Sequence, residues 1–237
     1  MSQDGLLLGV DIGTQSSKGV LVATDGRVVE QVQRPHGMAH PRPGHFEQDA
    51  EEVWWGDFVH LCRELLARDG VDPRAVAAVG VSGIGPCVVP ADAAGTPLRP
   101  GILYGIDTRA VGEAAWLTDH YGEDAVLAMG RSPLTSQAVG PKLLWLRRHE
   151  PDVSAATERF FMASSYVVFR LTGEYTLDHH SASGVNPFYD ASRHGTLRGS
   201  ATSSAGWRCR RCVGRRSRPA PCTPQQPSRP AWPRAPR

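Results

Sequence analysis

The chain has 237 residues, of which 41% are hydrophobic and 21% are charged, and its formal net charge is +2. These proportions are ordinary for a soluble globular protein, and no stretch reaches the ~20 consecutive apolar residues that a membrane-spanning helix needs. The composition therefore excludes a membrane protein, a collagen and a small disulfide scaffold, and the first residues carry no basic segment of the kind that opens a secretory signal.

Three strands are predicted at the start of the chain. Residues 6–12 are an apolar run of the buried-strand type, and residues 18–23 form a second strand. The turn-forming residues Thr24–Gly26 predict a hairpin, and a third strand with alternating hydrophobic residues follows at 27–33.

Strands and helices are mixed in the chain that follows. A helix is predicted to begin at Asp49, because Glu51 and Glu52 lie in its first turn, where acidic side chains stabilise a helix. The other predicted elements are strands at 75–82, 88–90 and 101–104, helices at 108–120 and 142–149, and a strand or short apolar helix at 160–171. This mixture predicts an α/β domain with a mixed sheet and flanking helices.

The loop between the first two strands is rich in glycine and hydroxyl side chains. A tight turn at Gly13 lets backbone N–H groups surround an anion, and Asp11 offers the carboxylate oxygens that Mg²⁺ prefers. The residues predicted to bind phosphate are Gly13, Thr14, Ser16, Ser17 and Lys18, and the predicted metal ligand is Asp11. The same residue types also form ordinary hairpin turns, and the spacing is not that of a Walker A loop.

This loop resembles the first phosphate loop of the superfamily of sugar kinases, actin and heat-shock chaperone ATPases, which implies a ribonuclease-H-like fold. Five further ordered segments resemble the FGGY family of carbohydrate kinases, in particular its xylulose kinase branch. They are Arg42–Asp49 with Val53–Trp55, Gly80–Gly85, Pro97–Ala110, Lys142–Leu146 and Arg170–Asp190. The resemblance covers about residues 6–195, and residues 1–195 are interpreted as the N-terminal domain of such a kinase.

The resemblance implies transfer of a phosphoryl group from ATP, with Mg²⁺, to a hydroxyl of a sugar or polyol. The expected sugar-binding residues are Gly83, Ile84 and Gly85 in one loop, with Asp107 and Arg109. Two alternatives come from helix capping, since Asp107 precedes the predicted helix 108–120 and Asp49 precedes another.

The sequence departs from the family pattern at two places. Tyr104 stands where the family often has Trp, and Ser82–Pro86 lacks the longer polar side chains of the xylulose and glycerol branches. These residues therefore do not identify the sugar substrate, and a pentulose is preferred over glycerol.

The family places its catalytic aspartate and its adenosine-binding residues in a second domain. No acidic residue follows Asp190 in this sequence, so no catalytic base is assigned and the 237 residues alone are expected to be inactive. Cys62 and Cys87 are interpreted as core cysteines of a cytoplasmic protein, and a full-length version is expected to form a homodimer.

Residues 196–237 differ in composition from everything before them. Residues 191–237, which include this segment, hold eleven Arg and no Lys, Asp or Glu. They carry a formal charge of +11, while residues 1–190 carry −9. The preferred interpretation is an out-of-frame or disordered tail. Two alternatives are an Arg-rich nucleic-acid-binding tail and a zinc site on Cys209 and Cys212 with Cys222, which supplies too few ligands.

Two other functions are alternative interpretations of the whole chain. A chaperone-like ATPase of the same superfamily fits the phosphate loop but does not explain the segments around Asp107 and Glu47. A nucleic-acid-binding protein would depend on the Arg tail, which lacks Lys and interleaved aromatic residues, and we do not expect it.

Overall fold

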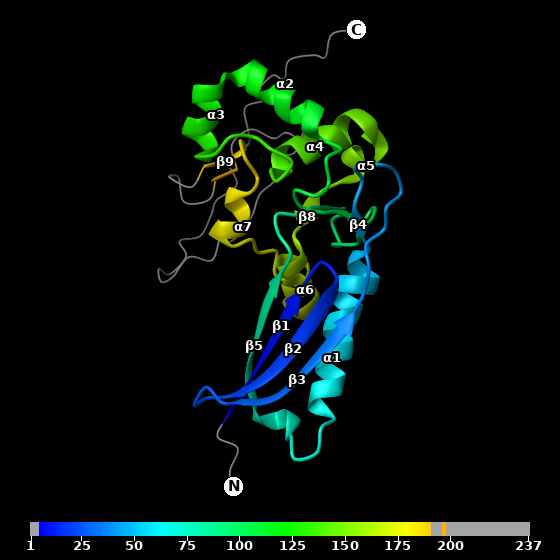
Figure 1. Ribbon diagram of the computed structural model, residues 1–237, viewed down its shortest axis with the longest axis vertical. Coiled ribbons are helices and arrows are strands. Elements are labelled where there is room, and N and C mark those ends of the chain that lie inside the picture. The colour runs from blue at the N-terminus through cyan, green and yellow to red at the C-terminus, as the bar shows by residue number, and fades with distance from the viewer. Residues whose placement is uncertain (1–4, 191–195, 198–237) are drawn as a thin grey trace.

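The computed structural model describes residues 5–190 and 196–197. Its centre is a four-stranded sheet in the order β3-β2-β1-β5, built from the strands β1 (Leu6–Ile12), β2 (Ser16–Ala23), β3 (Val28–Pro35) and β5 (Val76–Gly83). The first three strands are antiparallel neighbours, and β5 runs parallel to β1, with Leu8 opposite Val79 and Ile12 opposite Gly83. The predicted mixed sheet is therefore present (Figure 1).

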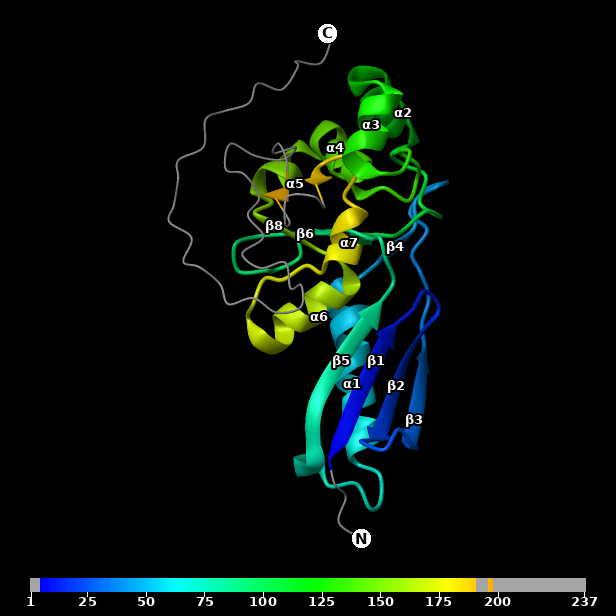
Figure 2. The same ribbon diagram turned by 90° about the vertical axis from the view of Figure 1, so that its left-hand side faces the viewer.

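Two helices pack on one face of this sheet, as Figures 1 and 2 show. The longer one is α1 (Gly56–Leu66), which continues a π-helical turn at Ala50–Trp55, and the other is α6 (Ala163–Thr172). Asp49 caps the π-helical turn, because its side chain accepts a hydrogen bond from the backbone N–H of Glu52. The capping role weighed for Asp49 is confirmed, although the α-helix itself begins later than predicted.

Alternation along β1 explains where the core lies. Leu6, Leu8, Val10 and Ile12 are buried, whereas Leu7 on the other face is 41% exposed. Because successive side chains of a strand point to opposite faces, the first set packs toward the helices. The core continues through Leu61 and Leu65 of α1 and through Trp54 and Tyr166, all of them fully buried.

A second group of elements stands beyond the end of the sheet at which β1 meets the loop (Figure 2). Its helices are α2 (Val111–Tyr121), α3 (Glu123–Gly130), α4 (Val139–His149), α5 (Pro151–Ala156) and α7 (His179–Ser183). Its short strand pairs are β4 (Glu47–Gln48) with β7 (Gly101–Ile102), β6 (Val89–Ala91) with β8 (Arg159–Phe161), and β9 (Tyr189–Asp190) with β10 (Thr196–Leu197).

The segment predicted as one strand or helix at 160–171 contains both. Strand β8 ends at Phe161, and α6 begins two residues later, where the Met162 backbone N–H donates to the Ser165 hydroxyl at 2.9 Å. Helices α3, α5 and α7 lie in segments for which no element was predicted. Among the described residues, no helix is long and apolar enough to cross a membrane. The tail interpretations, including the cysteines at 209, 212 and 222, fall in residues 198–237, outside the described part.

Candidate functional site

The loop between β1 and β2 is a tight turn closed by its own backbone. The Gly13 N–H donates to the Ser16 carbonyl at 3.1 Å, and a Cβ atom at Gly13 would lie 2.5 Å from that carbonyl oxygen. No side chain larger than hydrogen fits there, which explains the glycine. A tight turn is a conformation in which successive backbone N–H groups can form a concavity for an anion.

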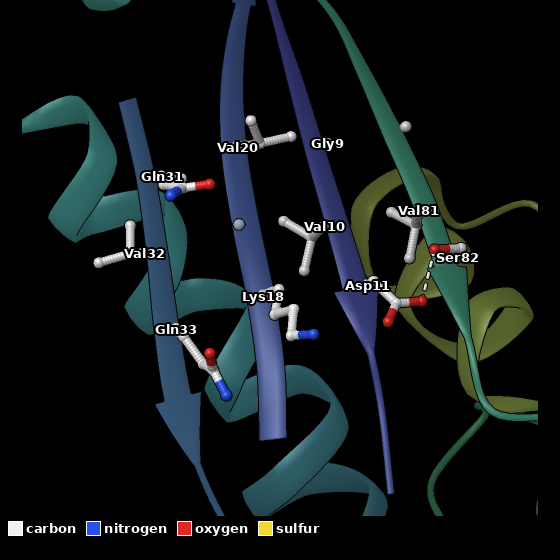
Figure 3. A pocket seen from close by; sticks show the side chains of 12 residues that line it. Gly9, Val10, Asp11, Lys18, Val20, Gln31, Val32, Gln33, Val81 and Ser82 are labelled. Atoms are coloured by element: carbon white, nitrogen blue, oxygen red, sulfur yellow. Dashed lines mark hydrogen bonds between the residues drawn. The ribbon is translucent and has the colours of Figure 1, made fainter. Parts of the chain in front are cut away.

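Asp11 and Lys18 stand beside this turn on the face of the sheet that faces away from α1 and α6. They are directly opposite in the β1–β2 register, and both side chains are exposed. The Ser82 hydroxyl on β5 donates to Asp11 Oδ1 at 2.6 Å (Figure 3). A carboxylate, a hydroxyl and an ammonium thus meet at the ends of three adjacent strands.

These three side chains lie in a hollow of about 850 Å³ on that sheet face. Figure 3 shows the hollow running along the strands, with the charged groups toward the loop end and Val20 and Gln31 further away. The carboxylate of Asp11 is a hard oxygen donor next to hydroxyl groups and a cation, a set that suits Mg²⁺ carried by phosphate oxygens. Among the described residues, no three His, Cys, Asp or Glu side chains gather as a metal cage.

The hydroxyl groups of the loop do not all face the same way. Thr14 Oγ1 donates to the Tyr104 hydroxyl at 3.3 Å, and Ser16 Oγ accepts from Gln33 Nε2 at 2.9 Å. Ser17 is fully buried and donates to Asp57 Oδ2 at 2.7 Å. Because the Ser17 hydroxyl points into the interior, its placement argues against the phosphate contact predicted for it.

Three buried polar side chains that were not predicted as site residues contact the loop or its supports from the interior of the protein. Gln48 Nε2 donates to the Thr14 carbonyl at 2.9 Å, and Trp54 Nε1 donates to Gln48 Oε1 at 2.9 Å. Asp57, which holds Ser17, also pairs with Arg34 Nε at 3.0 Å. Gln48 lies in the segment that resembles the FGGY pattern, and that was the one signal that could have identified it.

Asp107 and Arg109 form a buried ion pair rather than an open binding surface. Arg109 donates to both carboxylate oxygens of Asp107 at 2.8–3.0 Å, and Asp107 Oδ2 also accepts from the Phe46 backbone N–H at 2.7 Å. Both side chains have an exposed fraction of 0%. Glu47 continues the network by accepting from Arg109 at 2.8 Å and from Arg99.

The burial of Asp107 and Arg109 argues against direct contact of either side chain with a sugar. Asp107 Oδ1 also accepts from the Arg109 backbone N–H at 3.1 Å, while helix α2 begins only at Val111. Asp107 therefore holds the turn before the helix and is not its N-cap. Its observed role is structural, although it differs from the helix-capping role that the sequence suggested as an alternative.

The expected sugar loop follows directly on β5. The Ile84 N–H donates to the Ile12 carbonyl at 2.7 Å, so this residue extends the parallel ladder beyond Gly83. A Cβ atom at Gly83 would lie 3.0 Å from the Cβ of Ala163, whereas Gly85 is exposed with no atom within 4 Å of such a position. The structure thus brings the 83–85 segment next to the phosphate loop and leaves Gly85 open.

The phosphate loop is also linked, through Tyr104 and Gly105, to the segment that precedes α4. The Tyr104 hydroxyl accepts from Thr14, and the next residue, Gly105, is held on both sides by the segment before α4. The Gly105 N–H donates to Gln137 Oε1 at 3.2 Å, and Ser136 Oγ donates to the Gly105 carbonyl at 2.8 Å. Lys142 Nζ in turn donates to the Ser136 carbonyl at 2.8 Å.

Comparison with known families and proteins gives a consistent result. The model for the N-terminal domain of the FGGY family of carbohydrate kinases matches residues 6–193. Xylulose kinase from Streptomyces coelicolor is 36% identical over 183 residues, which are 76% of this chain and 36% of that protein. Glycerol kinase from Methylorubrum extorquens is 34% identical over 169 residues, 69% of this chain and 33% of that protein. The chain thus spans only about a third of the length of these relatives.

Solved structures agree with the fold. The crystal structure of xylulose kinase from Rhodospirillum rubrum matches with a TM-score of 0.73 and 32% identity, covering 79% of this chain and 38% of that one. A glycerol kinase from Plasmodium falciparum, solved with ADP, matches with a TM-score of 0.71 at 20% identity. The predicted fold class is therefore confirmed.

Proposed function

Because this chain belongs to the FGGY family of carbohydrate kinases, we propose that it provides the half of the active site that receives the phosphates of Mg²⁺-ATP. The observation that carries the proposal is the group formed by the Gly13 turn, Asp11 and Lys18 at the ends of adjacent strands. Phosphoryl transfer depends mainly on positioning and charge stabilisation, which such a group can supply.

Asp11 would hold Mg²⁺, and the backbone of the turn with Thr14, Ser16 and Lys18 would hold the phosphates. When bound, the ion neutralises charge on the phosphate oxygens. Ser82 orients the Asp11 carboxylate by donating to one of its oxygens, which leaves the second oxygen for the ligand. Lys18 adds a positive charge on the same face of the sheet.

The substrate would be a sugar or polyol, and we favour a pentulose. The support is the similarity to xylulose kinases together with the 83–85 segment beside the phosphate loop, of which Gly85 is exposed. Asp107 and Arg109 would act at a distance from the sugar, as positioning residues, because their buried pair fixes the segment that carries Tyr104. A cytoplasmic location and a homodimer of a full-length version remain part of the proposal.

The 237 residues alone would bind the phosphates of Mg²⁺-ATP but would not catalyse phosphoryl transfer. The resemblance places the catalytic base in a second domain, and the residues after Asp190 include no Asp or Glu that could take that role. General-base deprotonation of the sugar hydroxyl contributes ~10²–10⁴-fold to the rate of such reactions, so the rate without a base should be lower by about that factor.

Isothermal titration of the chain with Mg²⁺ and ATP tests the binding proposal. We expect measurable binding that needs Mg²⁺ and is lost in Asp11→Asn, while Asp25→Asn in the exposed turn between β2 and β3 binds like the wild type. Equal binding by Asp11→Asn and the wild type would contradict the assignment of Asp11. An ADP-release assay with D-xylulose checks the second part, and sustained turnover by these 237 residues would contradict it.

A further inference from the structure

The Thr14 carbonyl at the tip of the β1–β2 turn is held from below by one buried side chain. Gln48 Nε2 donates to this carbonyl at 2.9 Å, and Gln48 is only 2% exposed. The same amide nitrogen lies 3.4 Å from the Gly37 carbonyl and 3.3 Å from His36 Nδ1. The contact is therefore part of a packed polar cluster and not a surface encounter.

The orientation of the Gln48 amide is fixed by its other end. Trp54 is fully buried, and its Nε1 lies 2.9 Å from Gln48 Oε1. An indole N–H can only donate, so the oxygen of the amide must face Trp54 and its NH₂ group must face Thr14. Gln48 is thus a donor to the loop in a single orientation.

The geometry of the peptide bond determines where the next backbone N–H group points. In a planar trans peptide, the C=O of one residue and the N–H of the next point in opposite directions. Because the Thr14 carbonyl points down to Gln48, the Gln15 N–H points to the opposite side of the loop. The next carbonyl, that of Gln15, accepts from the His36 N–H at 2.9 Å, which in the same way turns the Ser16 N–H away from His36.

We propose that Gln48 is a positioning residue of the phosphate loop, and that it acts by presenting the Gln15 N–H to a phosphate oxygen. This rests on the proposed function, because it names how the same loop is prepared for its ligand. Consecutive N–H groups that converge on one side of a turn are the arrangement by which backbone binds anions.

NMR titration of the ¹⁵N-labelled full chain with inorganic tripolyphosphate and Mg²⁺ tests the inference. In the wild type we expect saturable binding that shifts the Gln15 amide. In Gln48→Met, which keeps the volume but cannot donate, we expect affinity about 2- to 10-fold weaker, the range that one neutral hydrogen bond gives. The Gln15 amide should also shift in the unliganded variant, which a purely structural loss elsewhere would not cause.

Two further variants keep the test decisive. Trp54→Phe leaves an aromatic ring in the core but frees the Gln48 amide to rotate, so it should weaken binding in the same direction even if Gln48→Met folds poorly. Val111→Met, on an exposed position of α2, is the control for introducing methionine and should bind like the wild type. Wild-type affinity in both Gln48→Met and Trp54→Phe would overturn the inference and leave the proposed function standing. Absence of tripolyphosphate binding in the wild type itself would overturn both.

Discussion

Arg109 is a buried cation that pairs with two buried carboxylates. Its side chain is 0% exposed and contacts the carboxylates of both Asp107 and Glu47. Breaking such a buried pair is costly, because the desolvation of an unpaired charge costs several kcal/mol. Arg99 also contacts Glu47, so Arg109 matters most for Asp107 and for the segment around Tyr104.

Arg109→Met should lower the free energy of unfolding by about 3–5 kcal/mol, because it leaves the buried carboxylate of Asp107 without its cation, while Glu47 keeps only Arg99. Urea denaturation at pH 7 measures this loss. The matched control is Arg27→Met, whose ion pair with Asp25 is 3.9 Å long and about two-thirds exposed, with exposed fractions of 69% and 66%. That pair should contribute less than about 1 kcal/mol. Similar losses in the two variants would contradict the role of the buried network.

Lys142 is a buried base whose charge is costly to the folded state. Burial lowers the pKa of its ammonium group from 10.5 to about 8, with the charge of Asp107 acting in the opposite direction. Between these two pKa values the unfolded chain keeps the proton while the folded chain has lost it. The free energy of unfolding must therefore rise with pH in this window.

Substituting Lys142 by Met should remove that rise. Between pH 8 and 10.5, the usual pKa of lysine, the wild type should gain about 3 kcal/mol of stability relative to Lys142→Met, since each pKa unit corresponds to 1.36 kcal/mol. Urea unfolding of both proteins at intervals across this range gives the difference, in which titrations of the cysteines and tyrosines largely cancel. A difference that stays constant with pH would show that Lys142 titrates normally.

At the scale of elements, the packing of α1 on the sheet is set by a glycine. A Cβ atom at Gly19 of β2 would lie 2.9 Å from Leu65 Cδ1 and 3.2 Å from Leu61 Cβ. The helix can approach this closely only because the strand has no side chain there. Gly80 of β5 faces the other side of the sheet, where no atom lies within 4 Å of such a position.

Two alanine substitutions should therefore differ although both fall in strands. Gly19→Ala overpacks the helix–sheet contact and should cost about 1–3 kcal/mol. Gly80→Ala enters open space in a strand, where alanine is better tolerated than glycine, and should change stability by less than about 0.5 kcal/mol. Thermal unfolding of both variants measures this, and a large loss for Gly80→Ala would show that the open face is covered.

Elements with strong local patterns were predictable, and those that depend on tertiary contacts were not. The apolar run at Leu6–Ile12 and the turn before β3 predict the first three strands of the sheet, with bounds within a few residues of those observed. The π-helical turn before α1 was missed, because Asp49 caps any helical turn and does not reveal which type follows. The site shows the same limit, since Ser17 and Asp107 have suitable chemistry but their burial follows from partners forty and sixty-one residues away.

At the scale of the whole molecule, the sheet has two unequal edges. β3 carries Glu30 and Arg34 and ends in Pro35, which are typical protections of an edge strand. β5 has no charged residue and no proline, and its Val79 is 48% exposed. Within the described residues, β5 pairs only with β1.

The unprotected edge should make the 237-residue chain prone to aggregation. Val79→Lys places a charge on β5 and should slow the growth of light scattering at 37 °C several-fold, because edge charges oppose strand pairing between molecules. Val111→Lys, at a helix position with 51% exposure, adds the same charge elsewhere and serves as control. Equal slowing by both variants would attribute the effect to net charge alone.

The parallel pairing of β1 with β5 also governs the order in which the chain can fold during synthesis. Strands β1, β2 and β3 are consecutive and need only short loop closures, so they can associate early. The pairing of Leu6 with Val76 must wait until α1 and the chain after it have emerged from the ribosome. Until then β1 lacks its partner on one side. The phosphate loop begins directly where β1 ends. The proposed phosphate binding by this loop is therefore expected only after β5 has joined the sheet.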